Sequence, residues 1–172
     1  MNIITVKHYI SPCGLLKLGS YGDKLCLCDW QVEKHRNLID QRLKTKLKAD
    51  FAEGDSEILR LASAQLDEYF TGCRHDFTIP LMFVGTDFQK TVWNELLNIP
   101  YGHTVSYGEI ARRIGMPKAV RAVANANGAN SISIFAPCHR VIGSDNSLTG
   151  YGGGINTKRM LLELEAASLM IQ

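Results

Sequence analysis

The chain has 172 residues, of which 45% are hydrophobic and 21% charged, and its formal net charge is +2. This length allows one large domain or two small ones, and the composition is typical of an ordinary globular protein. No apolar run approaches the length of a membrane span, and the first residues lack the layout of a signal peptide.

The first part of the chain predicts a small α/β supporting domain over residues 1–80. Strand-like alternation of apolar residues covers 3–10 and 15–30, with turn residues at 21–23. Apolar residues then recur at helical spacing over 56–71. The expected unit is a small sheet plus one helix, followed by a linker over 72–85.

The remaining residues, 81–172, predict a mostly α-helical domain. An amphipathic helix is expected from Phe88 to near Pro100. A last helix carries an apolar stripe of Met160, Leu161 and Leu164.

Two short helices are predicted between these. The pattern Ser106-Tyr107-Gly108-Glu109 is typical of a capping box, so a helix should start at Tyr107 and end at Gly115. Pro117 suits the first position of the next helix, which runs to about Gly128. Two short helices joined by a glycine-containing turn predict a helix-turn-helix.

The second of these helices has two expected faces. Small apolar side chains share the inner face: Ala119, Val120, Ala122, Val123 and Ala126. The outer face carries Lys118, Arg121 and Asn125.

The apolar run 131–136 leads into Pro137-Cys138-His139-Arg140-Val141. We predict an extended segment that stops at the proline and leaves Cys138 at the rim of a sheet or pocket. A thiol is nucleophilic as thiolate, and a histidine relay is one way to deprotonate it. Because His139 follows Cys138 directly, it is expected to act through a water rather than by direct contact.

The carboxylate of such a relay is expected in the last helix. Glu165 lies one turn after Leu161, at the edge of the apolar stripe, whereas Glu163 points the other way. A carboxylate facing an apolar surface needs a partner, and a histidine that must be oriented is a suitable one.

Five motifs occur in order along the chain: Val105-Ser106-Tyr107-Gly108-Glu109-Ile110-Ala111, Arg121-Ala122-Val123, Asn130, the Pro137–Val141 run, and Gly150-Tyr151-Gly152-Gly153-Gly154. This succession resembles the O6-alkylguanine-DNA alkyltransferases, also called methylated-DNA–protein-cysteine methyltransferases. The resemblance is dense from about Phe88 to Glu165.

The resemblance implies a DNA repair protein that flips O6-alkylguanine, and O4-alkylthymine as well, out of duplex DNA. The alkyl group would pass irreversibly to the protein's own Cys138 in a single turnover. The implied catalytic residues are Cys138, His139, Glu165 and Asn130. Of these, Asn130 would brace the turn beside the cysteine.

The resemblance also implies residues that bind DNA and the flipped base. Tyr107 would help rotate the phosphate, and Arg121 would fill the space that the extruded nucleotide leaves. Further contacts are expected from Asn127, Val141, Leu148, Tyr151 and Gly152.

The implied partner is double-stranded DNA carrying O6-alkylguanine, bound through the minor groove by a monomer, with no cofactor, metal or membrane. Five cysteines without an evident pairing scheme favour a reducing, cytoplasmic location. That would mean nucleoid association in a bacterium or the nucleus in a eukaryote.

Two other functions remain open. A lesion-binding module of the alkyltransferase-like class would flip the base without accepting the group, but that class lacks the acceptor cysteine. A thiol hydrolase could use the same cysteine, histidine and glutamate on a small acyl substrate.

Overall fold

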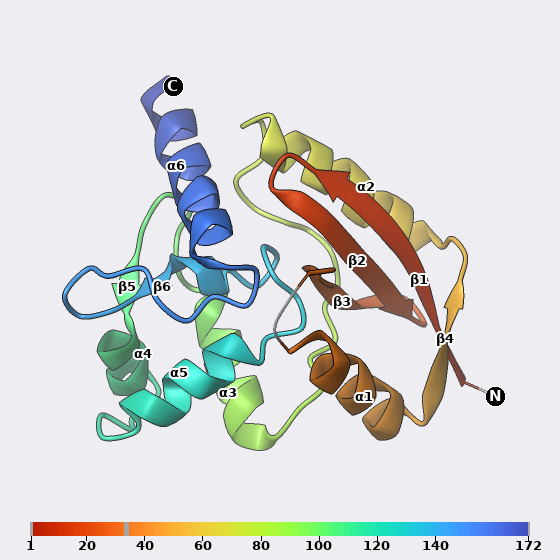
Figure 1. Cartoon of the computed structure of the whole chain (residues 1–172), viewed down its shortest axis with the longest axis horizontal. Helices are drawn as coiled ribbons and strands as arrows, with labels where there is room; N and C mark the ends of the chain where they lie inside the picture. Colours follow the sequence, from red (N-terminus) through yellow and green to blue (C-terminus); the bar gives the residue numbers. More distant parts are fainter. Residues whose placement is uncertain (1, 33–34, 172) are drawn as a thin grey trace.

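The computed structural model describes residues 2–32 and 35–171. The first part of the chain forms a four-stranded sheet and two helices (Figure 1). In chain order the elements are β1 (Asn2–Ser11), β2 (Gly14–Tyr21), β3 (Lys24–Trp30), α1 (Arg36–Leu47), β4 (Ala49–Glu53) and α2 (Glu57–Phe70).

The sheet has the strand order β3-β2-β1-β4, in which β4 pairs parallel to β1 and the other pairs are antiparallel. The predicted strands and the predicted helix α2 are confirmed. The sequence interpretation missed α1 and β4. Only three side chains of α1 are buried, Arg36, Ile39 and Leu43, so its apolar pattern is too sparse to stand out.

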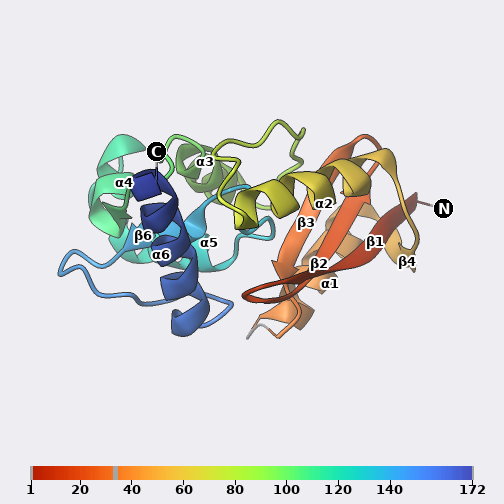
Figure 2. The ribbon, with the colours of Figure 1, turned by 90° about the horizontal axis from the view of Figure 1, so that it is seen from above.

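The two helices cover opposite faces of the sheet (Figure 2). Neighbouring residues of a strand point to opposite faces. Leu25 of β3 belongs to the core cluster that includes Leu59 and Leu66 of α2. Cys26 belongs to a second cluster, together with Ile39 of α1. Because the sheet is covered on both sides, β3 is buried along nearly its whole length.

The second part of the chain is mostly helical. Its elements are α3 (Asp87–Leu96), β5 (Val105–Ser106), α4 (Tyr107–Arg113), α5 (Val120–Gly128), the 3-10 helix η1 (Cys138–Arg140), β6 (Val141–Ile142) and α6 (Ile155–Ile171). The first helix ends at Leu96 rather than near Pro100. Among the described residues, no helix is both long enough and apolar enough to cross a membrane.

The starts of α4 and α5 differ in how well the sequence indicates them. Half of the predicted capping box is confirmed, since the Ser106 hydroxyl accepts a hydrogen bond from the amide of Glu109. The Glu109 carboxylate pairs with Arg112 and Arg113 instead of returning to the amide of Ser106. The predicted start of α5 at Pro117 is wrong, because the helix begins at Val120. Before it, the amide of Ala119 closes a turn onto the carbonyl of Met116 at 2.9 Å, which places Pro117 at the turn position that proline favours.

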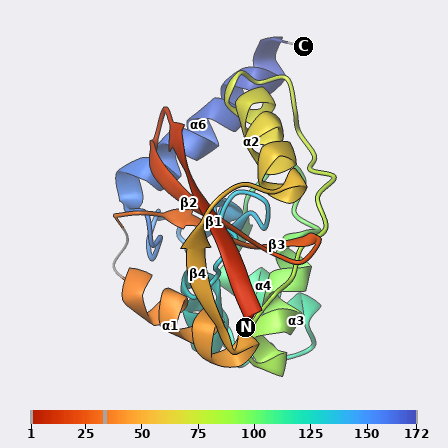
Figure 3. The same cartoon turned by 90° about the vertical axis from the view of Figure 1, so that its right-hand side faces the viewer.

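The edge strand β3 joins the two parts of the chain. Cys28 forms an isolated parallel bridge with Ile132, and its amide donates to the carbonyl of Ser131 at 2.8 Å. The amide of Leu25 donates to the carbonyl of Pro80 at 2.9 Å, so the predicted linker also lies along this edge. The C-terminal end of α2 approaches α6 where the two parts meet (Figure 3), and Tyr69 of α2 donates a hydrogen bond to Glu165 of α6 there.

Candidate active site

Cys138 follows a compact turn. The prediction of an extended run over 131–136 is wrong, because residues 133–135 form a turn and Cys138 begins η1. Ile134 lies in the left-handed region with a φ of 74°. Beyond the single bridge at Ile132, the run therefore curls back instead of continuing as a strand.

Asn130 explains why the run turns. Its side-chain amide donates to the carbonyl of Ala136 at 2.9 Å and to that of Ile132 at 3.4 Å. Its Oδ1 accepts from the amide of Ile132 at 3.0 Å. An asparagine side chain that satisfies backbone groups on both limbs of a turn holds its ends together.

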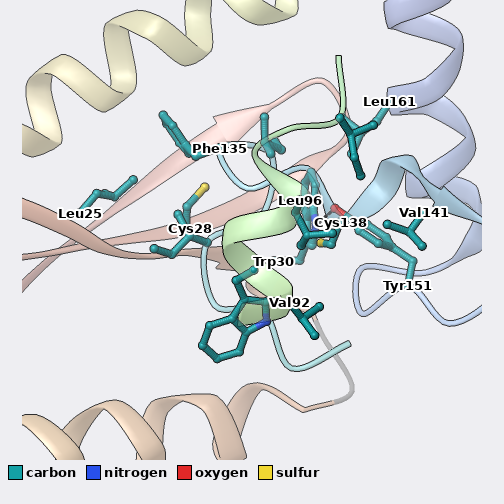
Figure 4. Packing of buried hydrophobic residues seen from close by; sticks show 14 of the residues in the cluster. Leu25, Cys28, Trp30, Val92, Leu96, Phe135, Cys138, Val141, Tyr151 and Leu161 are labelled. Atoms are coloured by element: carbon teal, nitrogen blue, oxygen red, sulfur yellow. Dashed lines mark hydrogen bonds between the residues drawn. The ribbon is translucent and has the colours of Figure 1, made fainter. Parts of the chain in front are cut away.

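The thiol of Cys138 is buried, with 4% of the residue exposed, among side chains that include Leu96, Val141 and Tyr151 (Figure 4). Burial raises the pKa of Cys138 to about 11. Since the thiolate is the nucleophile, a thiol in this position needs a base to remove its proton.

His139 and Glu165 form a fully buried pair. The Nε2 of His139 lies 2.6 Å from the Oε2 of Glu165. Burial alone would raise the pKa of Glu165, but hydrogen bonds from His139 and Arg140 outweigh it and hold that pKa well below its usual range. Burial also lowers the pKa of His139.

These charges fix the tautomer of the neutral His139. An ionised carboxylate only accepts hydrogen bonds, so Nε2 carries the proton and Nδ1 is the acceptor. Among the residues that the structure describes, none makes a hydrogen bond to this buried Nδ1. It is therefore the nitrogen that is able to receive a proton.

The sequence interpretation assigned no role to three residues around this pair. Arg140 donates to Glu165 through Nε at 2.8 Å and Nη2 at 3.1 Å, and through Nη1 to the carbonyl of Ile99 at 2.7 Å. Tyr69 donates its hydroxyl to Glu165 at 2.7 Å. Arg140 lies within the Pro137–Val141 motif, and this position is the sequence signal that marks it. Nothing in the sequence connects Tyr69 with Glu165.

Lys158 is the third of these residues, and it is fully buried. Its Nζ donates to the carbonyls of Val141 and Thr149, the latter at 3.0 Å. Burial lowers the pKa of Lys158 to about 8. The hydroxyl of Tyr107 donates to the same Thr149 carbonyl at 3.0 Å, so both side chains hold the segment before Gly150.

A cavity lies beside this segment. It is lined by His35, Gly128, Gly150, Tyr151, Gly152, Gly154 and Ile155. Of the predicted base-binding residues, Tyr151 and Gly152 line it directly. Leu148 is half-buried on the preceding loop, and Asn127 donates its side-chain amide to the carbonyl of Cys138 at 3.3 Å.

The predicted faces of α5 are confirmed only in part. Lys118, Arg121 and Asn125 are exposed, as expected. The inner face was predicted too broadly, because Val120 and Ala122 are also exposed. The buried positions of the helix are Val123, Ala126 and Asn127, whose spacing of three and four residues makes a narrow stripe.

The predicted stripe of α6 needs a similar correction. Leu161 is fully buried and Leu164 half-buried, but Met160 is 43% exposed. Glu165 is fully buried and Glu163 is exposed, as their positions on the helix indicated.

The glycine loop beside the cavity packs on Trp30 of β3. The indole Nε1 of Trp30 donates to the hydroxyl of Tyr151 at 2.9 Å. A Cβ added at Gly153 would stand 2.5 Å from the Cδ1 of that indole. The loop therefore has no room for a side chain at this position unless Trp30 moves.

Gly153→Ala is expected to lower the free energy of unfolding by about 1–3 kcal/mol, because the new methyl group overpacks a buried indole. Urea unfolding measures this. The control Gly108→Ala has its nearest neighbour atom at 3.7 Å and lies within α4, so it is expected to leave stability unchanged or raised. A Gly153→Ala protein as stable as the wild type would show that the loop yields freely.

Comparison with known proteins identifies the family. A sequence profile described as "6-O-methylguanine DNA methyltransferase, DNA binding domain" matches residues 87–167. The methylated-DNA–protein-cysteine methyltransferases of Mycobacterium bovis and Mycobacterium tuberculosis are 62% identical over 101 residues, which is 59% of this chain and 61% of each relative. The protein of the same name from Mycobacterium leprae is 58% identical over 155 residues, 90% of this chain and 88% of the relative.

The chain belongs to the methylated-DNA–protein-cysteine methyltransferase family. As a member of that family it carries the DNA-binding domain over residues 87–167. The fold agrees with this assignment. The crystal structure of Mycobacterium tuberculosis OGT in complex with DNA has a TM-score of 0.82 and 44% identity, over 95% of this chain and 94% of that chain.

Proposed function

We propose that this chain is a DNA repair protein that transfers the alkyl group of O6-alkylguanine in duplex DNA to the Sγ of Cys138. The observation that carries the proposal is the buried Cys138–His139–Glu165 arrangement. Cys138, whose thiol has a raised pKa, is followed directly in the chain by His139, whose pKa is lowered and whose Nδ1 has no hydrogen-bond partner among the described residues. Family membership supplies the substrate class.

In the proposed reaction, Cys138 passes its proton through a water to Nδ1 of His139, and Glu165 stabilises the imidazolium. The thiolate attacks the alkyl carbon, a carbon–sulfur bond forms, and the bond from that carbon to O6 breaks. The electron pair stays on the guanine, which takes up the proton that the thiol lost. The product is a thioether that this site cannot hydrolyse, so each molecule acts once.

Other residues bind the DNA and the flipped base in this proposal. Residues 81–172 form the functional domain and 1–80 support it. The pair α4 and α5 acts as a helix-turn-helix in the minor groove, with Arg121 entering the duplex in place of the extruded nucleotide. Tyr107 assists the rotation, and the flipped base binds against Tyr151, Gly152 and the backbone of Val141 and Leu148.

The proposal extends to alkylthymine and to the setting of the reaction. O4-alkylthymine presents the same alkyl–oxygen bond and is a second substrate. The protein acts as a monomer in the cytoplasm. The observation that supports the cytoplasmic location is that all five cysteines, each among the described residues, are free thiols.

Incubation with excess duplex DNA containing O6-methylguanine is expected to add the mass of one methyl group to the intact protein. The methyl group should lie on the Cys138 peptide. Cys138→Ser should gain nothing, whereas Cys73→Ser, which removes an exposed thiol, should react like the wild type.

The two other outcomes point to the alternative functions. Tight binding of the lesion without a change in mass would make the protein a lesion-binding module. If the protein neither gained mass nor bound the lesion, the thiol hydrolase would be the function to test next. The presence of Cys138 favours the transferase over the lesion-binding module.

A further inference from the structure

Tyr69 connects the sheet-containing part of the chain with the relay. It lies in the last turn of α2, 96 residues before Glu165 in the sequence. Its hydroxyl donates to the Oε2 of Glu165 at 2.7 Å, and both side chains are fully buried. A charge-assisted hydrogen bond of this length in a dry interior is strong.

The bond falls on the oxygen that orients His139. Oε2 of Glu165 accepts from Tyr69, from the Nε2 of His139 at 2.6 Å and from the Nη2 of Arg140 at 3.1 Å. The other oxygen accepts from the amide of Gly102 and from the Nε of Arg140. Arg140 and Gly102 therefore keep the carboxylate partnered without Tyr69. The additional effect of Tyr69 is a second hydrogen bond to Oε2, the oxygen that also accepts from His139.

The ring of Tyr69 is held in place. It packs edge-on against Phe70 and Tyr101, with ring centroids 5.1 and 6.2 Å away, and lies 5.6 Å from the ring of Phe77. Burial, reinforced by the charge of Glu165, raises the pKa of Tyr69 well above its usual value. The hydroxyl is therefore a fixed donor that keeps its proton throughout the pH range of the reaction.

We propose that Tyr69 is a positioning residue for alkyl transfer, which acts through Glu165 on His139 and so makes α2 part of the relay. The inference rests on the proposed function. By donating to Oε2, the phenol takes up part of the negative charge that otherwise favours imidazolium. Tyr69 thus helps to keep His139 neutral, which is the state that accepts the proton of Cys138.

Several charged or titratable groups besides Tyr69 bear on this equilibrium. Glu165 and Lys158 face His139 from α6, and Arg140 faces it from η1. Tyr101 acts on the same carboxylate from the loop after α3. None of these groups changes when only the hydroxyl of Tyr69 is removed.

Tyr69→Phe keeps the ring and its packing and removes one donor. Without that donor, Oε2 attracts the imidazolium more strongly, so the pKa of His139 rises. We expect the acidic limb of the transfer rate to move to higher pH by about half a unit to one unit, which is a loss of about 3- to 10-fold on that limb relative to the variant's own alkaline rate. The alkaline rate itself should be equal to that of the wild type or higher, because a more basic imidazole accepts the proton of Cys138 more readily, and the affinity for DNA should be unchanged.

The measurement is the single-turnover methyl-transfer rate of the full chain as a function of pH. The matched control is Tyr9→Phe. The Tyr9 hydroxyl donates to Asp67 of α2 at 2.6 Å, so this variant also removes a tyrosine–carboxylate hydrogen bond but leaves the relay intact. Its profile should superimpose on that of the wild type. A Tyr69→Phe profile that also superimposes would overturn the inference.

An NMR titration of the His139 imidazole, run in both variants and the wild type, separates this inference from the proposed function. It reports the coupling from Tyr69 to His139 whether or not methyl transfer occurs. A raised pKa of His139 in Tyr69→Phe alone supports the inference even if the substrate is wrong. An unchanged pKa contradicts it even if the wild type repairs DNA.

Discussion

Glu165→Ala is expected to lower the free energy of unfolding by about 3–5 kcal/mol, because it leaves the guanidinium of Arg140 buried without its carboxylate. Arg140 is 5% exposed and has two of its nitrogens on Glu165. The substitution also removes the acceptor that fixes the tautomer of His139. We therefore expect methyl transfer to be lost even where the protein is still folded.

Denaturant unfolding and the intact-mass assay measure the two effects. Glu163→Ala is the matched control, since it removes an exposed carboxylate from the same helix and should change neither. Removing both charges, with Arg140→Leu and Glu165→Leu together, should cost less stability than Glu165→Ala alone. A double variant at least as unstable as the single one would show that the unpaired guanidinium is not the cause.

The features that the sequence predicts correctly are those that neighbouring residues determine. The start of α4 follows from Ser106 and Glu109, which lie three residues apart and are joined by the hydrogen bond from the Glu109 amide to the Ser106 hydroxyl. The burial of Glu165 beside Leu161 follows from helical periodicity in the same way.

The turn before Cys138 was mispredicted because tertiary contacts override local propensity. The apolar, β-branched composition of 131–136 favours a strand. Asn130 instead closes the segment onto Ala136, and β3 offers it only one bridge, at Cys28. Neither contact leaves a periodic trace in the segment itself.

Contacts between the two parts of the chain are likewise not visible in the sequence. Tyr69 and Glu165 are 96 residues apart, and Trp30 and Tyr151 are 121 residues apart. The sequence around each of these residues indicates only an ordinary position in a helix, strand or loop. The predicted role of residues 1–80 as support therefore omitted the side chains that reach the relay and the glycine loop.

His139→Gln is expected to slow methyl transfer near neutral pH by about 10²- to 10⁴-fold, the usual contribution of a general base. With the pKa of Cys138 at about 11, only about one thiol in 10⁴ is ionised at pH 7 without help. In the variant, only this ionised fraction of Cys138 can attack the alkyl carbon, because no imidazole takes up the proton of the thiol. Its rate should therefore rise about tenfold for each pH unit towards the pKa of the thiol.

The wild type behaves differently because its base is already neutral. Burial lowers the pKa of His139, so the relay is in its accepting form above about pH 6.5 and the rate should be flat there. Single-turnover rates across the alkaline range distinguish the two profiles, with exposed His103→Gln as control. A His139→Gln rate that is slow but independent of pH would mean that the proton of Cys138 leaves by another route. The loss would then reflect misplacement of Glu165 and Arg140 rather than the absence of a base.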